Sequence, residues 1–185
     1  MQVSEVYTTA SGPDRPEIER ETYALLDRLG IPYVRVEHGP ANTMEDCIDI
    51  DRALNTRICK NLFLCNRQKT AFYLLSMPGD KPFQTKELSR QLGCSRLSFA
   101  PGELMEELLH CPPGSASVLG LAHDTEHRVR YLMDRDIYES ETLGCHPCLN
   151  LGSMRLNTGD IKTVFLPFTG HEVTVVDLPR DPLEG

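Results

Sequence analysis

A length of 185 residues predicts one domain, and a chain of this size buries enough surface to fold without disulfides or structural metals. Hydrophobic residues make up 40% of the chain and charged residues 25%, which is typical of a globular protein and excludes a disordered one. No apolar run approaches the ~20 residues of a membrane span. The first residues lack the basic and apolar regions of a signal peptide. We therefore expect a cytoplasmic protein with no membrane partner.

The cysteines and the charges narrow the class further. Seven cysteines, an odd number, lie between Cys47 and Cys148, mostly among apolar residues, and are expected to be free thiols in a reducing compartment. The net charge of −8 argues against a general nucleic-acid binder. The segment from Arg52 to Arg96, however, holds nine Lys or Arg and two acidic residues. Such a basic segment fits contact with a phosphate backbone at one place, or a chance cluster on solvated faces.

Local signals in the first half of the chain predict, in order, a helix at 16–29, a strand at 33–37, a helix that starts at 43–46 and leads into 48–54, and a hairpin at 58–77. Pro16 suits the first turn of the first helix and Gly30 suits its C-terminal cap. Thr43, followed by acidic residues, is typical of a helix start. The polar residues 66–69 form the predicted turn of the hairpin.

The second half mixes short helices and strands irregularly. We expect helices at 85–92 and 101–109 with an extended segment 95–99 between them, strands at 129–133, 149–156 and 171–178, and a helix at 159–165 capped by Thr158. The ends, at about 1–14 and 179–185, are predicted to be loose. This mixture indicates an α+β single domain around a mixed β-sheet rather than a doubly wound fold.

Cys145-His-Pro-Cys148 is the most conspicuous motif. A thiol-redox site needs its first cysteine at a helix N-terminus, whereas the residues that follow here are typical of a strand. A zinc site needs a second pair of ligands, and His123 and His127 straddle a predicted turn. Both readings stay open as minor alternatives to two incidental cysteines beside a useful histidine.

Two other features carry possible chemistry. The segment 113–120 fits neither a nucleotide-binding loop nor a dinucleotide fingerprint, but its small residues would let backbone N–H groups cradle an anion or oxyanion. Its alternative is a plain loop. Lys60 interrupts an apolar strand, as either an exposed edge residue or a positive point in a pocket. No Ser/His/Asp order or nucleophile elbow is visible.

Taken together, an ordered set of short motifs resembles the YbaK/ProX superfamily, and most closely its bacterial prolyl-tRNA editing proteins. The motifs are Thr43-Met-Glu-Asp46, Lys60-Asn-Leu-Phe-Leu64, Leu97-Ser-Phe99, Pro113-Gly-Ser115, Asp134 and His146-Pro147. The resemblance covers roughly 23–176, and Lys60-Asn-Leu-Phe-Leu64 is its most specific member.

The resemblance implies a curved mixed β-sheet flanked by helices. It also implies hydrolysis of the ester that joins a wrong amino acid to tRNA, chiefly alanine on proline tRNA. The expected partner is the tRNA acceptor end, with prolyl-tRNA synthetase as a further candidate, and neither a metal nor a cofactor is required. An aminoacyl ester is already activated, so positioning and oxyanion stabilisation suffice and no covalent nucleophile is needed.

The same resemblance implies roles for single residues. Lys60 would hold the terminal adenosine or the ester, Asn61 would support that geometry, backbone groups around Gly114 would close on the amino acid, and His146 would line the pocket. These four form the predicted catalytic set. The predicted substrate-binding residues are Thr43, Ser115, Ala116, Ser117, Val118, Cys145 and Pro147.

Two positions depart from the family pattern. Val118 stands where the loop is usually closed by proline, and Cys145 stands where a large aromatic residue often precedes the His-Pro pair. Both bear on which amino acid is removed, because a small hydrophobic pocket selects alanine over proline by size. The alternatives are editing of cysteine on the same tRNA, a non-catalytic module that binds tRNA or a synthetase, and a thiol oxidoreductase that uses Cys145 and Cys148.

Overall fold

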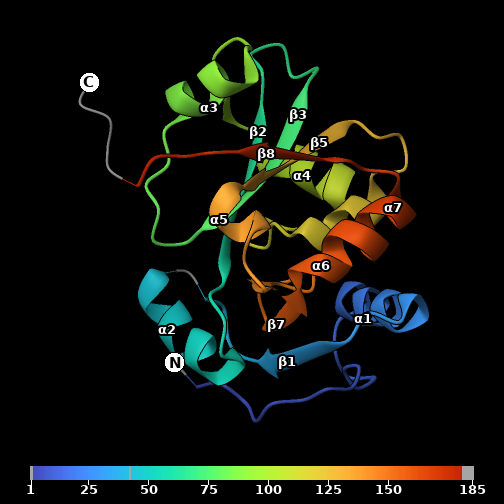
Figure 1. Ribbon diagram of the computed structural model, residues 1–185. Coiled ribbons are helices and arrows are strands. Elements are labelled where there is room, and N and C mark those ends of the chain that lie inside the picture. Colours follow the sequence, from blue (N-terminus) through green and yellow to red (C-terminus); the bar gives the residue numbers. More distant parts are fainter. Residues whose placement is uncertain (1, 42, 181–185) are drawn as a thin grey trace.

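The computed structural model describes residues 2–41 and 43–180. Their strands form two sheets, which helices flank (Figure 1). The strands are β1 (Tyr33–Glu37), β2 (Cys59–Cys65), β3 (Phe72–Pro78), β4 (Ser98–Phe99), β5 (Val129–Asp134), β6 (Thr142–Cys145), β7 (Gly152–Asn157) and β8 (Val173–Val176). The helices are α1 (Glu17–Leu29), α2 (Met44–Leu54), α3 (Thr85–Leu92), α4 (Gly102–Leu109), the 3₁₀-helix η1 (Val118–His123) and α5 (Arg135–Tyr138). A last helical run joins α6 (Thr158–Asp160), the π-helical η2 (Ile161–Phe165) and α7 (Leu166–Thr169).

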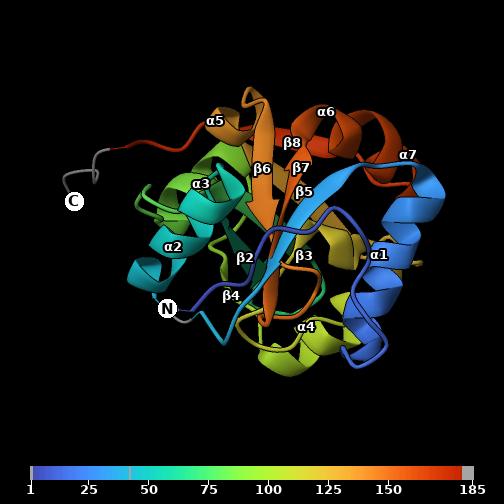
Figure 2. The same cartoon turned by 90° about the horizontal axis from the view of Figure 1, so that it is seen from below.

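The larger sheet is mixed and has the order β4-β2-β3-β5-β8. Its β2–β3 hairpin is antiparallel, whereas β3 pairs in parallel with β5, and β5 with β8. The smaller sheet is antiparallel, in the order β1-β7-β6. In the view from below it lies across the larger sheet, with α1 and α2 on its two flanks (Figure 2). The predicted α+β class with a mixed sheet is confirmed, and its strands divide between two sheets.

The two sheets meet where β2 begins and β6 ends. Ile58 forms an isolated parallel bridge with Gly144, and the Gly144 N–H donates to the Arg57 carbonyl oxygen over 3.1 Å. A Cβ atom at residue 144 would lie 2.8 Å from that oxygen, so only glycine allows this approach. The contact brings the start of β2 beside the residues that follow β6, and both contribute to the site.

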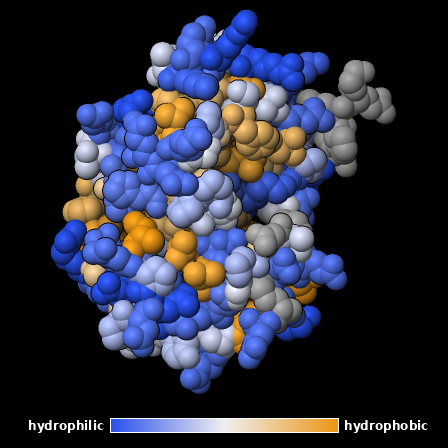
Figure 3. All heavy atoms as spheres, turned by 180° about the vertical axis from the view of Figure 1, so that it is seen from behind, coloured by the Kyte–Doolittle hydropathy of each residue, from blue (hydrophilic) through white to orange (hydrophobic). Residues whose placement is uncertain are grey.

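Apolar side chains fill both sides of the larger sheet. One core includes Tyr23 of α1, Leu74 of β3, Tyr131 of β5 and Phe165 of η2, all completely or almost completely buried. A second core lies on the opposite face, where Leu88 of α3 packs. The surface is largely hydrophilic, and in the view from behind, apolar side chains form separate patches in the upper and middle parts of the face (Figure 3). In the described part of the chain, no helix has the length and apolar character needed to span a membrane.

The predicted elements of the first half are confirmed, with bounds within one or two residues for α1, β1 and β2, and the same holds for α3 in the second half. The N-terminal residues, predicted to be loose, lie along β1, where Val3 bridges His38 and Tyr7 bridges Arg35. Arg35 secures this segment by stacking over the Tyr7 ring at 4.5 Å. Of the other end, residues 181–185 lie outside the described residues.

Three predictions in the second half need correction. Thr158 does not cap the last helix: it is the buried first helical residue. Asn157 occupies the cap position, and its side chain bonds to the Asp160 carboxylate over 3.3 Å instead of capping the backbone. That helical run continues to Thr169 rather than ending at Phe165. The strand expected at 149–156 begins only at Gly152. The sequence reading also missed β6, α5 and η1, which are short elements placed by their neighbours.

Candidate functional site

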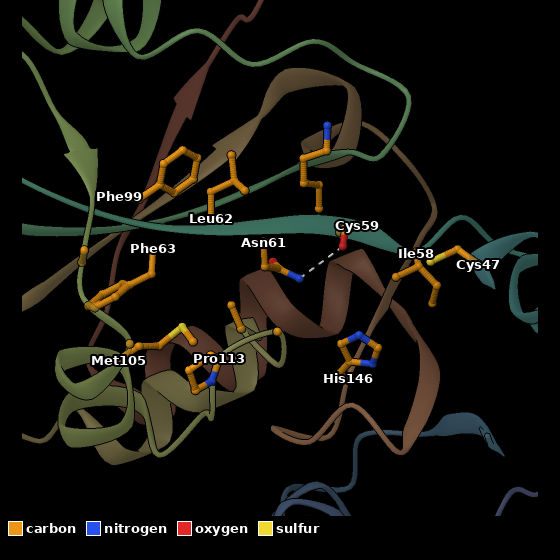
Figure 4. Close-up of a pocket in the computed structure, with 15 residues that line it drawn as sticks. Cys47, Ile58, Cys59, Asn61, Leu62, Phe63, Phe99, Met105, Pro113 and His146 are labelled. Carbon is orange, nitrogen blue, oxygen red and sulfur yellow. Dashed lines mark hydrogen bonds between the residues drawn. The ribbon is translucent and has the colours of Figure 1, made fainter. Parts of the chain in front are cut away.

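A cavity of about 360 Å³ lies between β2, the N-terminal part of α4 and the segment 113–116, with His146 at one wall (Figure 4). Five of the predicted site residues line it, namely Lys60, Asn61, Gly114, Ala116 and His146. Most of the other lining residues are apolar: Cys47, Ile58, Cys59, Leu62, Phe63, Phe99, Ala100, Gly102, Met105 and Pro113. The cavity is thus an apolar recess with a few polar groups, the usual form of a site for a small ligand.

Asn61 is held by a chain of buried hydroxyl groups. Tyr131 donates its hydroxyl to Ser76 Oγ over 2.9 Å, and Ser76 donates to Asn61 Oδ1 over 2.5 Å. Because Oδ1 is engaged as an acceptor, the amide nitrogen of Asn61 is the group left to face the cavity, with a long 3.4 Å contact to the Cys59 carbonyl (Figure 4). The site therefore offers an oriented N–H donor.

His146 lies on the same side of β2 as Asn61 (Figure 4). Its Nδ1 is 2.8 Å from the Gly152 carbonyl oxygen, which can only accept, so Nδ1 carries the hydrogen. Burial lowers the pKa of His146 to about 4. The hydrogen bond to Gly152 raises the pKa, but by less than burial lowers it. At neutral pH the ring is therefore uncharged, and Nε2 has a free lone pair at the cavity.

A second buried imidazole supports this arrangement. Ser153 Oγ lies 3.2 Å from His146 Nδ1 and 2.8 Å from His38 Nε2. His38 Nδ1 donates to the Gly39 carbonyl over 2.6 Å, so its Nε2 accepts the Ser153 hydroxyl hydrogen. Burial lowers the pKa of His38 as well. The three side chains fix the tautomer and the orientation of His146.

Lys60 lies at the edge of the cavity, but its ammonium group points elsewhere. Successive residues of a strand face opposite sides, so Lys60 shares the face of Leu62, not that of Asn61. Its Nζ donates to the Lys81 carbonyl oxygen over 3.1 Å. Figure 4 shows Leu62 and Phe99 on this other side of β2. Lys60 and Asn61 therefore flank one strand and do not converge on one point.

The segment 113–116 forms another wall. Gly114 has a φ of +84°, which favours glycine, and exposes backbone to the cavity beside Ala116. The neighbouring serines face inward: Ser115 Oγ accepts from the Asn150 N–H at 2.9 Å, and Ser117 donates to the His146 carbonyl at 2.7 Å. Ser115 and Ser117 thus anchor the wall from behind and do not line the cavity.

The remaining predicted substrate-binding residues also lie outside the lining. Val118, Cys145 and Pro147 are buried behind it. Thr43 is exposed and caps α2: its Oγ1 accepts from the Asp46 N–H at 3.2 Å, and Asp46 accepts from the Thr43 N–H at 3.0 Å. Through the wall they support, Val118 and Cys145 can influence the shape of the cavity without touching a ligand.

The Cys145–Cys148 pair has neither thiol-redox nor metal geometry. Cys145 ends a strand rather than opening a helix, and burial raises the pKa of its thiol. Cys148 is buried, with a φ of +60°. Within 2–41 and 43–180, no cluster of three or more His, Cys, Asp or Glu side chains could hold a metal ion. The arrangement fits two incidental buried thiols flanking His146.

The sequence reading missed the groups that shape and orient the site. Phe63 and Met105 line the cavity, and Phe99 lies at its edge with 61% of its surface exposed. Phe63 and Phe99 stand in two of the resemblance motifs without an assigned role, and Met105 stands in none. Ser76 and Ser153, which hold Asn61 and His146, follow no motif, because the pairing of distant strands brings them into place.

Comparisons with known proteins identify the family of the chain. Residues 38–164 match the family of aminoacyl-tRNA editing domains. The chain is 31% identical over 176 residues to "Prolyl-tRNA synthetase associated domain-containing protein 1" of Danio rerio, covering 94% of each protein. It is 28% identical to the "Prolyl-tRNA editing protein ProX" of Acetoanaerobium sticklandii, over 80% of this chain and 90% of that protein.

The fold has matches among solved structures too. A crystal structure of a candidate trans-editing enzyme for prolyl tRNA synthetase superposes with a TM-score of 0.68, covering 91% of this chain and all of that one, at 18% identity. The family match over residues 38–164 thus defines an aminoacyl-tRNA editing domain, and the fold agrees with it. The chain belongs to that family, the YbaK/ProX superfamily, and is related to its prolyl-tRNA editing members.

Proposed function

We propose that this protein is an aminoacyl-tRNA deacylase of the cytoplasm that hydrolyses the ester of mischarged tRNA, with alanine on proline tRNA as its first substrate. The observation that carries the proposal is the pairing of Asn61 and His146 at one cavity, each held by its own buried hydrogen-bond chain. Similarity to the prolyl-tRNA editing protein ProX supports the choice of tRNA. Prolyl-tRNA synthetase is a candidate partner.

The chemistry needs one water molecule and two oriented groups. The ester carbonyl would accept a hydrogen bond from the Asn61 amide, which stabilises the oxyanion as it forms. The lone pair of His146 Nε2 would accept a hydrogen bond from the attacking water or from the amino group of the substrate. Water adds at the carbonyl carbon, the ribose oxygen leaves with a proton, and the products are a free amino acid and uncharged tRNA.

The cavity supports selection by size. Gly114 and Ala116 present backbone and a methyl group on one side, and Phe63 and Met105 line another. We propose that alanine fits between these walls and that proline does not, because a pocket can exclude a larger side chain by steric overlap. Lys60, on the other face of β2, would hold the terminal adenosine rather than the ester.

The test is deacylation of alanyl-tRNA carrying the proline anticodon, with cysteinyl-tRNA and prolyl-tRNA as comparison substrates. We expect fast loss of alanine only. Asn61→Ala should lower kcat by on the order of 10²-fold, as loss of an oxyanion donor does. Asn157→Ala, which alters an exposed asparagine, is the matched control and should retain wild-type kcat. Lys60→Ala should mainly raise KM.

The other outcomes are informative as well. Removal of cysteine but not alanine would assign the enzyme to the other substrate on the same tRNA. Binding of tRNA without turnover, at enzyme concentrations above that of the tRNA, would overturn the hydrolase proposal in favour of a binding module. Turnover unaffected by Asn61→Ala would refute the oxyanion role while leaving the activity in place.

A further inference from the structure

A second hollow, of about 570 Å³, lies on the opposite side of β2 from Asn61 and is called the basic groove here. Its cations are Lys60, Lys86 and Arg96, and its aromatic side chains are Phe83 and Phe99. Among the described residues, no aspartate or glutamate lines it. Lys60, Leu62 and Phe99 line both the groove and the cavity, so the two hollows adjoin along the edge of the sheet.

Phe99 is the most exposed large hydrophobic side chain in the described part of the chain, at 61%. The short edge strand β4 holds it in place, pairing Phe99 with Leu64 of β2. Phe83 meets it edge-on, with ring centroids 6.0 Å apart and an interplanar angle of 67°. A rigidly presented, largely exposed aromatic ring is a stacking platform of the kind that binds nucleic-acid bases.

The cations of the groove differ in their ion pairing from other Lys and Arg residues of the segment 52–96. Arg57 pairs with Asp80, Arg90 with Glu87, and Lys81 is buried against Asp134. Within 2–41 and 43–180, by contrast, neither Lys86 nor Arg96 forms an ion pair. On a chain of net charge −8, this is a local positive site that complements a phosphate backbone.

We propose that the basic groove binds the single-stranded 3′ end of the tRNA. A base stacks on Phe99, Lys86 and Arg96 contact the phosphates, and the terminal ribose passes Lys60 so that its ester enters the cavity. This inference rests on the proposed function, since it takes tRNA as the substrate. An acidic peptide would use the cations, but it would leave the exposed ring of Phe99 and the continuity with the cavity without a purpose.

The test measures binding alone, by fluorescence anisotropy of an uncharged, labelled single-stranded RNA that ends in CCA. Stacking of one base contributes about 1–3 kcal/mol, so Phe99→Ala should weaken binding by roughly 5- to 150-fold. Phe99→Trp should retain it. The matched control is Phe168→Ala on α7, where an equally large ring is 51% exposed outside the groove, and it should bind like the wild type.

Salt dependence tests the cations separately. For a single strand, each lost phosphate contact lowers the slope of log affinity against log salt by about 0.7. Lys86→Ala and Arg96→Ala should each show this change, whereas Arg20→Ala, which removes an exposed cation of α1, should not. A labelled acidic peptide should bind weakly and without dependence on Phe99.

Equal binding by the wild type and Phe99→Ala, or an equal loss with Phe168→Ala, would overturn the groove proposal. Tight binding of the acidic peptide that depends on the same residues would replace RNA by a protein partner. The two proposals fail separately. If the protein deacylates tRNA and Phe99→Ala has no effect, only the groove proposal is refuted. If RNA binding depends on Phe99 but no turnover occurs, only the hydrolase proposal is refuted.

Discussion

His146 shows how burial of a single side chain sets both chemistry and stability. Its pKa is about 4 in the folded protein and about 6.5 in an unfolded chain, so between these values only the unfolded state binds the proton. The contribution of His146 to the free energy of unfolding is therefore largest above pH 6.5. It falls by about 1.4 kcal/mol per pH unit for this proton as the pH is lowered toward 4. His38, whose pKa is lowered too, changes stability in the same direction.

The prediction concerns the difference between the wild type and His146→Gln in urea unfolding, measured between about pH 7 and pH 4.5. The wild type should lose stability more steeply than the variant on acidification, because only the wild type has this proton to take up on unfolding. Thr43→Ser, which removes no titratable group and retains the cap of α2, should follow the wild type. Parallel pH curves for the wild type and His146→Gln would show that the imidazole is not held neutral by the fold.

At the scale of single elements, α2 isolates a structural role for a residue that the sequence assigns to substrate binding. Thr43 and Asp46 form a reciprocal capping box at its start, and Thr43 does not line the cavity. Thr43→Ala should lower the free energy of unfolding by about 1 kcal/mol, as the loss of an N-cap hydroxyl does. Thr43→Ser should retain the cap and the stability. Both are measured by urea denaturation.

Deacylation kinetics of the same two variants distinguish the capping role from the binding role. If Thr43 only caps α2, kcat/KM for alanyl-tRNA changes by less than about twofold in either variant once both are folded. A tenfold loss in Thr43→Ala without a matching loss of stability would instead assign the hydroxyl to the substrate, as the family resemblance implies.

The elements also show how far local patterns reach. Each helix start, glycine cap or hairpin turn depends on only a few neighbouring residues. The caps at residues 30 and 93 and the polar turn therefore made α1, α3 and the β2–β3 hairpin predictable. The strand β6 was not, because four residues with a glycine show no periodicity and the strand exists only through its pairing with β7.

In the site, too, local motifs predict some residues, and the pairing of distant strands places the others. That Asn61 and His146 would line one pocket was predictable from the resemblance motifs, whereas the groups that orient them were not. Ser76 reaches Asn61 through the register of β2 and β3, and Ser153 reaches His146 through the placement of β7. Strand alternation places Lys60 and Asn61 on opposite faces of β2. The consequence for the site could not be predicted, because the sequence does not show that β2 lies between two hollows.

At the scale of the whole molecule, one buried ion pair ties together segments that are far apart in the chain. Lys81 Nζ lies 2.9 and 3.0 Å from the two carboxylate oxygens of Asp134, and both side chains are almost completely buried. Asp134 also accepts from the Leu178 N–H at 3.1 Å and from the Asp136 N–H at 3.0 Å. The pair thus joins the loop after β3, the end of β5 and the C-terminal segment.

Asp134→Ala should lower the free energy of unfolding by about 3 kcal/mol, because it leaves the buried Lys81 ammonium with only the more exposed Asp136 carboxylate, 3.3 Å away, as a counter-charge. Arg57→Ala breaks an exposed pair of similar length, Arg57–Asp80 at 2.7 Å, and should cost within about 1 kcal/mol. The double variant Lys81→Met, Asp134→Leu removes both charges and should recover much of the loss. Urea denaturation of the three variants measures these differences. A loss for Asp134→Ala no larger than that for Arg57→Ala would mean that the buried pair does not hold these segments together.

The Lys81 carbonyl oxygen also accepts the hydrogen bond from the Lys60 ammonium group. Because Asp134→Ala releases Lys81, this variant should in addition weaken binding of the CCA-ending RNA.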